Sequence, residues 1–330
     1  MTQSARPSPP RPHSADRGTT LAGSEAFVQG TEVWVPDGEL LRHHSGSYGP
    51  HAEFARVSAV KTFRRGEGLP GAVFSTRRPE VWQELGSHFV RSEIAKASGI
   101  EAAVGFPLFR GKELVAVVVL LCGARNRTRG CVEIWDVNQE MRHLEHSGGY
   151  YGGLEAFGKL SRLLQFQSGT GLPGLALERG VPQVIEREGQ SNAFIRASIA
   201  RDYGIETGIA IPIFRGDSVA HVLVLLSTST TPIARAFEVW APEGEGLVLR
   251  SSHYATGLEA FAEASAKLCF KPGEGLPGRS FESGLPVVFD QIKAPEFVRS
   301  GAASAAGLCS GVAIPVIDGT RVRAVACLLS

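Results

Sequence analysis

The chain has 330 residues, 43% of them hydrophobic and 20% charged, so it carries enough apolar sequence for more than one buried core. Its 34 Lys and Arg residues are balanced by 33 Asp and Glu residues, which argues against the basic face that nucleic-acid binding requires. The longest apolar run, 114–122, is far shorter than the about 20 residues of a membrane-spanning helix. Five Cys residues without C-x-x-C spacing are typical of reduced thiols in a cytosolic protein.

The N-terminal segment differs in composition from the rest of the chain. Residues 1–20 are rich in Pro, Ser and Arg, and the first large aliphatic residue is Leu21. Such a segment cannot bury enough apolar surface to offset the entropy lost on ordering. We therefore expect a disordered tail over residues 1–25, and no apolar core of a secretory signal is present in it.

The remaining sequence repeats itself three times. The most visible mark is the hexapeptide GEGLPG at 66–71, which returns as GTGLPG at 169–174 and as GEGLPG at 273–278. A Trp within EVW, EIW and EVW keeps nearly the same spacing, at Trp34, Trp135 and Trp240. A period of about 100 residues is the size of a small domain rather than of a solenoid repeat. The prediction is three tandem domains, at 26–123, 129–227 and 234–330, whose linkers can be cut to release compact fragments.

Each copy predicts the same order of elements. A hairpin around the Trp is followed by a helix, the glycine-rich turn with a short helix, a short strand, a second helix that ends at a Gly, and two long apolar strands. The second copy places Leu154, Phe157, Leu160, Leu163 and Leu164 on one apolar stripe of its first helix. The pattern indicates an α+β fold, a central antiparallel sheet with helices packed on one face of each domain.

This order of signals resembles the GAF domain family. The motifs that carry the resemblance are the GEGLPG-like turn, a following G-x-P at 180–182 and 284–286 (Arg-Pro at 78–79 in the first copy), an F-x-R, a Gly, and a strand with an apolar-Pro pair. The resemblance covers residues 26–330 and implies a GAF/PAS-like fold with a sensory or ligand-binding role. The linkers 124–130 and 227–235 are too short for the long flanking helices through which such domains commonly pass signals.

Polar residues recur at two places in each copy, and we predict that they line ligand pockets. His and Tyr near the end of the second strand offer tunable hydrogen-bonding groups, and Arg at the start of the second helix offers a planar fork for phosphate or carboxylate. The predicted ligand-binding residues are His44, Tyr48, Arg91, His146, Tyr150, Arg196, Arg250, Tyr254 and Arg299. The alternative is a structural role for these residues. The Tyr would then be half-buried at a solvent-exposed strand end, and the Arg would hydrogen-bond a nearby carbonyl or carboxylate to hold its helix in place.

Catalytic and metal sites are not predicted. The glycines formally match the dinucleotide fingerprint, but the chain lacks βαβ alternation, so the motif indicates a structural turn. The pairs His43-His44 and His143-x-x-His146 have poor spacing for one ion on a strand.

Some GAF-like proteins reduce free methionine sulfoxide with cysteines, and the third copy holds Cys269, Cys309 and Cys327. Of these, Cys309 is expected to be accessible and the other two to lie in the core. Covalent attachment of a bilin is not expected either, because the chain lacks the Cys-His dipeptide to which some GAF-like relatives attach it.

The sequence thus favours a cytoplasmic, non-enzymatic sensory or regulatory protein that binds small molecules or a signalling protein partner. A protein-interaction scaffold without a ligand and a thiol-dependent methionine sulfoxide reductase are the alternatives. No nucleic-acid or membrane partner is expected, and the sequence identifies neither a cofactor nor the oligomeric state.

Overall fold

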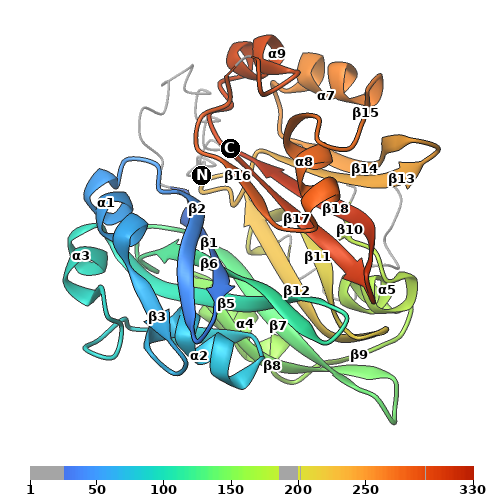
Figure 1. Ribbon diagram of the computed structural model, residues 1–330. Coiled ribbons are helices and arrows are strands. Elements are labelled where there is room, and N and C mark those ends of the chain that lie inside the picture. Colours follow the sequence, from blue (N-terminus) through green and yellow to red (C-terminus); the bar gives the residue numbers. More distant parts are fainter. Residues whose placement is uncertain (1–25, 186–199, 201, 294) are drawn as a thin grey trace, which may run out of the picture.

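The computed structural model describes residues 26–185, 200, 202–293 and 295–330, so the expected tail at 1–25 lies outside the described residues (Figure 1). The first repeat forms a six-stranded antiparallel sheet with the strand order β3-β2-β1-β6-β5-β4. Its elements are β1 (Val28–Asp37), β2 (Leu40–Ser47), α1 (Ala52–Val60), β3 (Thr62–Arg64), α2 (Gly68–Thr76), β4 (Glu80–Gln83), α3 (Ser92–Ala97), β5 (Ile100–Arg110) and β6 (Glu113–Gly123).

The other two repeats have the same sheet order, which confirms the predicted α+β class. The second contains β7 (Gly130–Asn138), β8 (His143–Gly152), α4 (Glu155–Ser161), β9 (Gln165–Gln167), α5 (Gly171–Arg179), β10 (Gln183–Val184), β11 (Ile205–Arg215) and β12 (Ser218–Thr228). The third contains β13 (Ala236–Glu243), β14 (Gly246–Tyr254), α7 (Glu259–Ala266), β15 (Cys269–Phe270), α8 (Gly275–Ser283), β16 (Val287–Phe289), α9 (Ser300–Ala305), β17 (Gly311–Asp318) and β18 (Arg321–Leu329).

Both faces of the long strands are buried, which explains their unbroken apolar sequence. In β6, Val117 and Val119 pack under the helices of their own repeat, together with Trp34. The alternate residues Val118 and Leu120 belong to a second core on the opposite face of the sheet. The sheet therefore separates a core inside the repeat from a core outside it.

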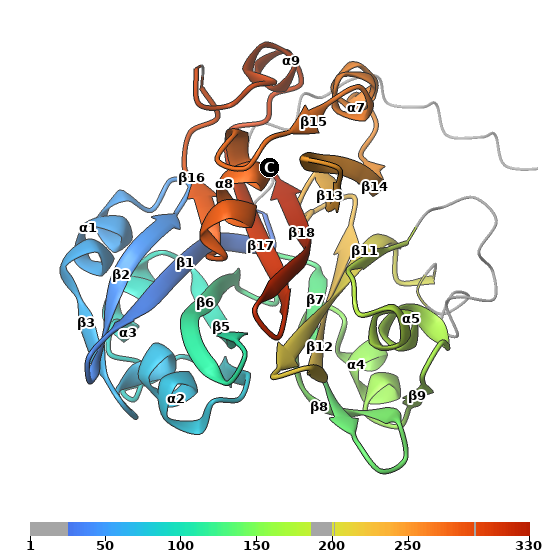
Figure 2. The ribbon, with the colours of Figure 1, turned by 45° about the vertical axis from the view of Figure 1, so that its right-hand side comes forward.

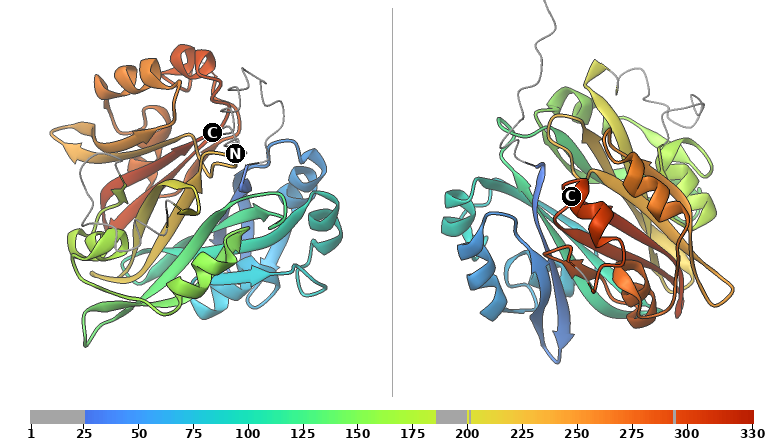
Figure 3. Two further views of the ribbon diagram at one scale, coloured as in Figure 1. Left: turned by 180° about the vertical axis from the view of Figure 1, so that it is seen from behind. Right: turned by 90° about the horizontal axis from the view of Figure 1, so that it is seen from above.

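The outer core is shared by all three repeats, which lie around a common centre (Figure 2). Equivalent residues of the three penultimate strands, Phe106, Ile211 and Ile314, are all buried there. Strands β5, β11 and β17 contact one another at this centre, and the views from behind and from above show the three repeats meeting at the same place (Figure 3).

The turns of three hairpins close the arrangement into a ring. Gly111 N–H donates to the carbonyl oxygen of Gly319, Gly319 N–H to that of Gly216 (3.0 Å), and Gly216 N–H to that of Gly111 (2.7 Å). The edge strands follow the same cycle: β4 contacts β8, β10 contacts β13 and β14, and β16 contacts β1 and β2. Because the third repeat returns to the first, the chain is a closed pseudo-threefold ring rather than an open array.

The linkers belong to this single body. Thr128, Ser227 and Ile233 are buried, and Arg129 N–H donates to the Thr231 hydroxyl at 2.6 Å. A shared core and buried linkers argue against the compact single-repeat fragments that the repeat period suggested, because a lone repeat would expose one apolar face of its sheet.

The predicted apolar stripe of the first helix in the second repeat is partly wrong. Helix α4 ends at Ser161, and although Leu154 and Phe157 are buried, Leu160 is 39% and Leu163 81% exposed. Leu163 lies beyond the helix in the turn towards β9, whereas Leu160 lies within the helix but beside the buried face formed by Phe157, Gly158 and Ser161. The glycine stops expected after the second helix are confirmed for Gly99 and Gly307, whose φ values are 69° and 67°. The helix expected from Phe194 lies almost wholly outside the described residues.

Candidate functional site

An ion pair is buried between the sheet and the helices of the first repeat. Arg91 lies at the start of α3 and Glu32 in β1, and both side chains are almost completely enclosed. Arg91 Nη2 donates to Glu32 Oε2 at 2.9 Å, and Nη1 donates to Oε1, so the contact is bidentate. This geometry is the one in which Arg and a carboxylate bind each other most strongly.

Further polar groups complete the surroundings of this pair. Arg91 also donates to the Ser58 hydroxyl, while Trp34 Nε1 and the Tyr48 hydroxyl donate to the two Glu32 oxygens at 3.2 and 3.1 Å. The guanidinium lies over the Phe54 ring, 4.6 Å from its centroid. Burial alone raises the pKa of Glu32, but attraction to Arg91 and the hydrogen bonds outweigh burial and hold that pKa below its ordinary value.

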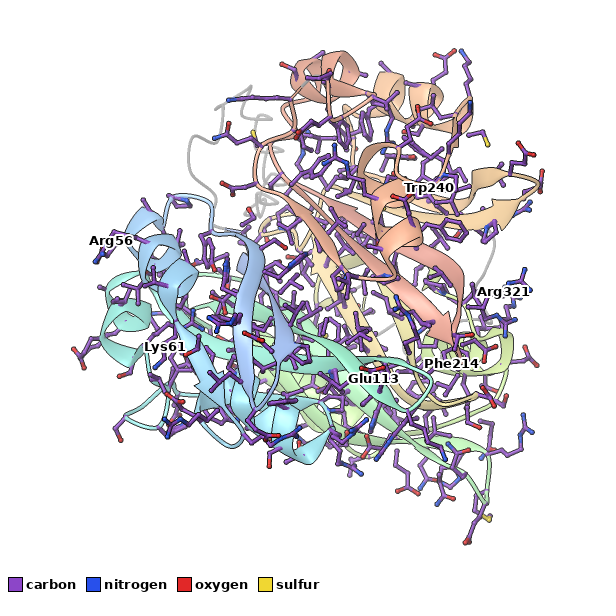
Figure 4. The ribbon with its side chains drawn as sticks, in the orientation of Figure 1. Arg56, Lys61, Glu113, Phe214, Trp240 and Arg321 are labelled. Carbon is purple, nitrogen blue, oxygen red and sulfur yellow. The ribbon has the colours of Figure 1, made fainter. Side chains whose placement is uncertain are left out.

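The third repeat contains the same arrangement. Arg299 Nη2 donates to Glu238 Oε2 at 3.0 Å, and Trp240 Nε1 donates to the same oxygen at 2.9 Å. The Tyr254 hydroxyl donates to Oε1 at 2.8 Å, and Trp240 lies inside the third repeat (Figure 4). In the second repeat the Trp135 and Tyr151 side chains donate to Glu133 at 3.1 and 3.2 Å, while Arg196 lies outside the described residues.

In the second repeat, the predicted residues His146 and Tyr150 do not stand at the positions that His44 and Tyr48 occupy in the first. The β7–β8 turn occupies 139–142, whereas the β1–β2 turn occupies only 38–39. Tyr151, not Tyr150, therefore matches Tyr48, and His146 matches His43 rather than His44, as their hydrogen bonds to the respective Tyr hydroxyls show (both 2.8 Å). Tyr150 faces the neighbouring repeat and donates to the Gly123 carbonyl at 2.7 Å.

The structure brings together some of the predicted ligand-binding residues and separates others. Tyr48 joins Arg91, and Tyr254 joins Arg299, through the shared Glu carboxylates. His44 is exposed, and Arg250 is exposed and paired with Glu243.

Sequence reasoning missed the carboxylate and hydroxyl partners of this network, although a signal for both is present. A Glu stands two residues before each recurring Trp, and a Ser stands four residues after each recurring Phe of the first helix. The missed residues are Glu32, Glu133, Glu238, Ser58, Ser161 and Ser265.

The glycine-rich turn closes on itself. Gly66 N–H donates to the Gly71 carbonyl at 2.7 Å, Gly71 N–H donates to Glu67 at 3.1 Å, and the Leu69 side chain is buried. The amides of Gly66 and Gly71 are thus engaged within the turn, as a structural role requires.

The thiols differ from expectation at one position. Cys309 is exposed and Cys327 is buried, as the sequence predicted, but Cys269, expected in the core, is exposed. Cys269 starts the edge strand β15, where its side chain points away from the sheet's covered face. Among the described residues, no three His, Cys, Asp or Glu side chains gather as a metal site would require, and no helix is long and apolar enough to span a membrane.

A cavity of about 390 Å³ lies between the first and third repeats. The first repeat contributes the start of β1, the end of β2 and the loop after it; the third contributes β16 and the ends of β17 and β18. Its lining includes Val28, Thr31, Ser47, His51, Leu120, Ile233, Val312 and Leu328.

Small side chains in the first repeat leave this space open. Thr31 and Ser47 are paired across β1 and β2. The equivalent pairs are Val132 with Tyr150 and Phe237 with His253. At the interface of the first and second repeats, Tyr150 stacks on Phe27 with ring centroids 5.7 Å apart. An aromatic ring thus fills the interface between the first and second repeats, whereas the equivalent interface between the third and first repeats contains a cavity.

A second cavity of about 380 Å³ lies at the junction of the second and third repeats and is strongly polar. Its charged lining residues are Arg142, Glu178, Arg179, Asp217, Asp318 and Arg323. Positive and negative side chains are equal in number there, and Arg323 is paired with Asp318 at 2.8 Å.

Comparisons with known proteins give matches to single repeats. No protein-family model and no curated protein matches the chain. The GAF domain of nlh2 from A. aeolicus, in an inactive state, is 24% identical over 29% of this chain and 58% of its own, with a TM-score of 0.25. The fRMsr protein of Staphylococcus aureus, in complex with substrate, is 16% identical over 29% of this chain and 56% of its own (TM-score 0.24). A GAF domain/HD domain protein from Geobacter sulfurreducens is 10% identical over 29% of this chain and 63% of its own (TM-score 0.26).

The matched region thus spans less than two thirds of each of these structures. Every repeat of the present chain has the curled six-stranded antiparallel sheet with helices on one face and the same order of motifs. The chain thus consists of three tandem repeats of one α+β fold, and GAF domains are among the solved structures to which it is similar.

Proposed function

We propose that this protein is a non-enzymatic regulatory protein that binds a small molecule in the cavity between its first and third repeats. The observation that carries the proposal is the cavity itself. The second and third repeats have larger side chains at the positions equivalent to the small lining residues of the first repeat. Its volume of about 390 Å³ falls in the range of about 300–1,000 Å³ typical of small-molecule sites.

The energetic cost of such a space supports this assignment. Protein interiors are close-packed, and an unfilled apolar cavity lowers stability because its walls lose contacts. The chain already contains side chains that suit the equivalent positions, Tyr150 and Phe237, yet the first repeat has Ser47 and Thr31. A ligand would restore the lost contacts and give the small residues a function.

The spaces inside the repeats are less suited to a ligand. In the first and third repeats, the region between sheet and helices is occupied by the Glu–Arg pairs and the aromatic rings around them. Because the charges of these pairs satisfy each other, a ligand there would have to replace buried ionic hydrogen bonds. The site at the junction requires no such exchange.

The arrangement of the thiols favours a binding protein over the thiol reductase. Cys269 and Cys309 are the exposed thiols among the described residues. Cys269 lies in edge strand β15 and Cys309 precedes β17, four strands away in the sheet order. Four strand spacings separate the two residues by about 19 Å along the sheet. A disulfide requires the Cα atoms of its two cysteines to lie within about 7 Å of each other.

Native mass spectrometry of the purified full chain tests the proposal. We expect a small molecule to be retained by the protein, or the neutral fluorophore N-phenyl-1-naphthylamine to bind when it is added. Ser47→Tyr, which copies Tyr150, should abolish binding because the ring fills the cavity. His44→Tyr, on the same strand but exposed, is the matched control and should bind normally.

Two results would contradict the proposal. Binding that survives in Ser47→Tyr and in Thr31→Phe would place the ligand elsewhere. Binding lost in His44→Tyr would instead favour the ligand site at the end of the second strand that the sequence predicted. Methionine sulfoxide reduction by the parent protein, lost in Cys309→Ser, would establish the enzyme instead.

A further inference from the structure

The junction cavity has an apolar interior and a more polar rim. Four aliphatic lining side chains, Leu120, Ile233, Val312 and Leu328, are at most 7% exposed, and so is Thr31. Pro50 and Ser330 are exposed and mark the opening. A ligand that enters would therefore place most of its surface against aliphatic groups, which favours an apolar body.

Charged side chains are missing from this lining. Among the described residues that line the cavity there is no Lys, Arg, Asp or Glu. A phosphate, carboxylate or ammonium group placed here would lose its hydration without gaining an ionic partner, which is strongly unfavourable. Burial lowers the pKa of the one titratable lining side chain, His51, which favours its uncharged form.

Two neighbouring hydroxyl groups, those of Thr31 and Ser47, are among the polar groups of the lining, which also includes Gln29, His51, Ser310 and Ser330. Thr31 and Ser47 are direct cross-strand neighbours in β1 and β2, so their side chains stand side by side. Both line the cavity, and no hydrogen bond of either hydroxyl is found within the described part of the chain. A hydroxyl can donate and accept, so the pair can hold a ligand hydroxyl or carbonyl.

We propose that the occupant is an uncharged, mainly apolar molecule with one hydroxyl or carbonyl group, held by Thr31 and Ser47. This assignment rests on the proposed function and adds the chemical class of the ligand. It differs from the anionic ligand that the recurring Arg residues suggested, because Arg91 and Arg299 are engaged with carboxylates inside their repeats.

A displacement experiment with matched ligands tests this class. The full chain is loaded with N-phenyl-1-naphthylamine at pH 7.5 and titrated with 1-decanol or with decanoate, which have the same chain length and differ in charge. We expect decanol to displace the fluorophore at a concentration about tenfold or more below that of decanoate. Thr31→Val, which copies Val132, should lower the affinity for decanol about fivefold because a hydrogen bond is lost.

The outcomes separate the two proposals. If Ser47→Tyr removes fluorophore binding but decanoate competes as well as decanol, the site stands and the uncharged class is overturned. If Thr31→Val leaves decanol displacement unchanged, the role of the Thr31 hydroxyl is overturned. If the fluorophore does not bind, or binds equally to Ser47→Tyr and Thr31→Phe, both the site and the ligand class are overturned.

Discussion

At the scale of the residue, the Glu–Arg pairs show how charge is held inside an apolar core. Taking two charges out of water costs several kcal/mol each, and the cost is recovered only when geometry is good and every remaining hydrogen-bonding group is served. In the first repeat Ser58, Trp34 and Tyr48 provide extra hydrogen bonds, and one buried group of the pair, Arg91 Nε, has no partner among the described residues. The pair ties β1 to the start of α3, so it fixes the helix layer on the sheet.

Removing the negative charge should therefore be costly. We expect Glu32→Gln to destabilise the protein by about 3–5 kcal/mol, because Arg91 stays buried without a counter-charge. The exposed pair Glu53–Arg56 (2.7 Å) is the control, and Glu53→Gln should leave the urea midpoint almost unchanged. Equal effects of the two substitutions in urea denaturation would show that the buried pair has no special role.

The same variant gives a pH test. The folded pKa of Glu32 lies below its ordinary value of 4.5, so its contribution to stability is fully present above pH 4.5 and is lost as the pH falls through the folded pKa. The stability difference between the parent and Glu32→Gln should be constant near neutral pH and should shrink in acid. A difference that grows on acidification would contradict the assigned direction of the pKa.

At the scale of the element, the glycine-rich turn determines how closely its helix approaches the preceding strand. A Cβ added at Gly71 would lie 2.1 Å from the Arg64 carbonyl oxygen, and the equivalent distances at Gly174 and Gly278 are both 2.2 Å. Real Cβ atoms do not approach backbone oxygen this closely. The last glycine of the motif is thus required by packing, which accounts for its presence in all three repeats without any phosphate ligand.

A pair of Gly→Ala variants tests this explanation. Gly71→Ala should destabilise the protein by about 1–3 kcal/mol, because the backbone of the turn must move to make room. Gly301→Ala in α9, where nothing lies within 4 Å of the added Cβ, should stabilise it by about 0.5–1 kcal/mol. Thermal denaturation of both variants measures the difference, and a neutral Gly71→Ala would refute the packing argument.

At the scale of the whole molecule, the closed ring couples the three repeats. Each sheet buries its second face against the other two, and the glycine hydrogen bonds at the hairpin turns join all three at one point. Unfolding one repeat would expose apolar surface on both of its neighbours. The repeats are therefore expected to unfold together.

Calorimetry tests this coupling directly. We expect one transition whose calorimetric and van't Hoff enthalpies agree, as for a single cooperative unit. Gly71→Ala in the first repeat should lower the midpoint of that whole transition. Three resolved transitions, with only one of them moved by the substitution, would restore the independent domains that the repeat period suggested.

Local patterns in the chain were sufficient for the elements and their order. The glycine-rich turns, the strand pair that ends each repeat and the glycine stops at Gly99 and Gly307 follow from short-range sterics, so they can be predicted from a few neighbouring residues. The threefold recurrence of these patterns predicted the α+β class and the resemblance to GAF domains. The network inside each repeat was only half visible, since Arg91 was recognised but Glu32, 59 residues earlier in the chain, was not.

The sequence by itself therefore determined the repeat, its fold and the residue types of its polar core. Only the tertiary structure decided that the repeats close into a ring, that Tyr150 faces a neighbouring repeat, and that Thr31 and Ser47 line a cavity. The physical reason is that these features depend on contacts between residues far apart in the chain. A small residue in a strand has the same local propensity whether a neighbouring repeat covers it or leaves space beside it.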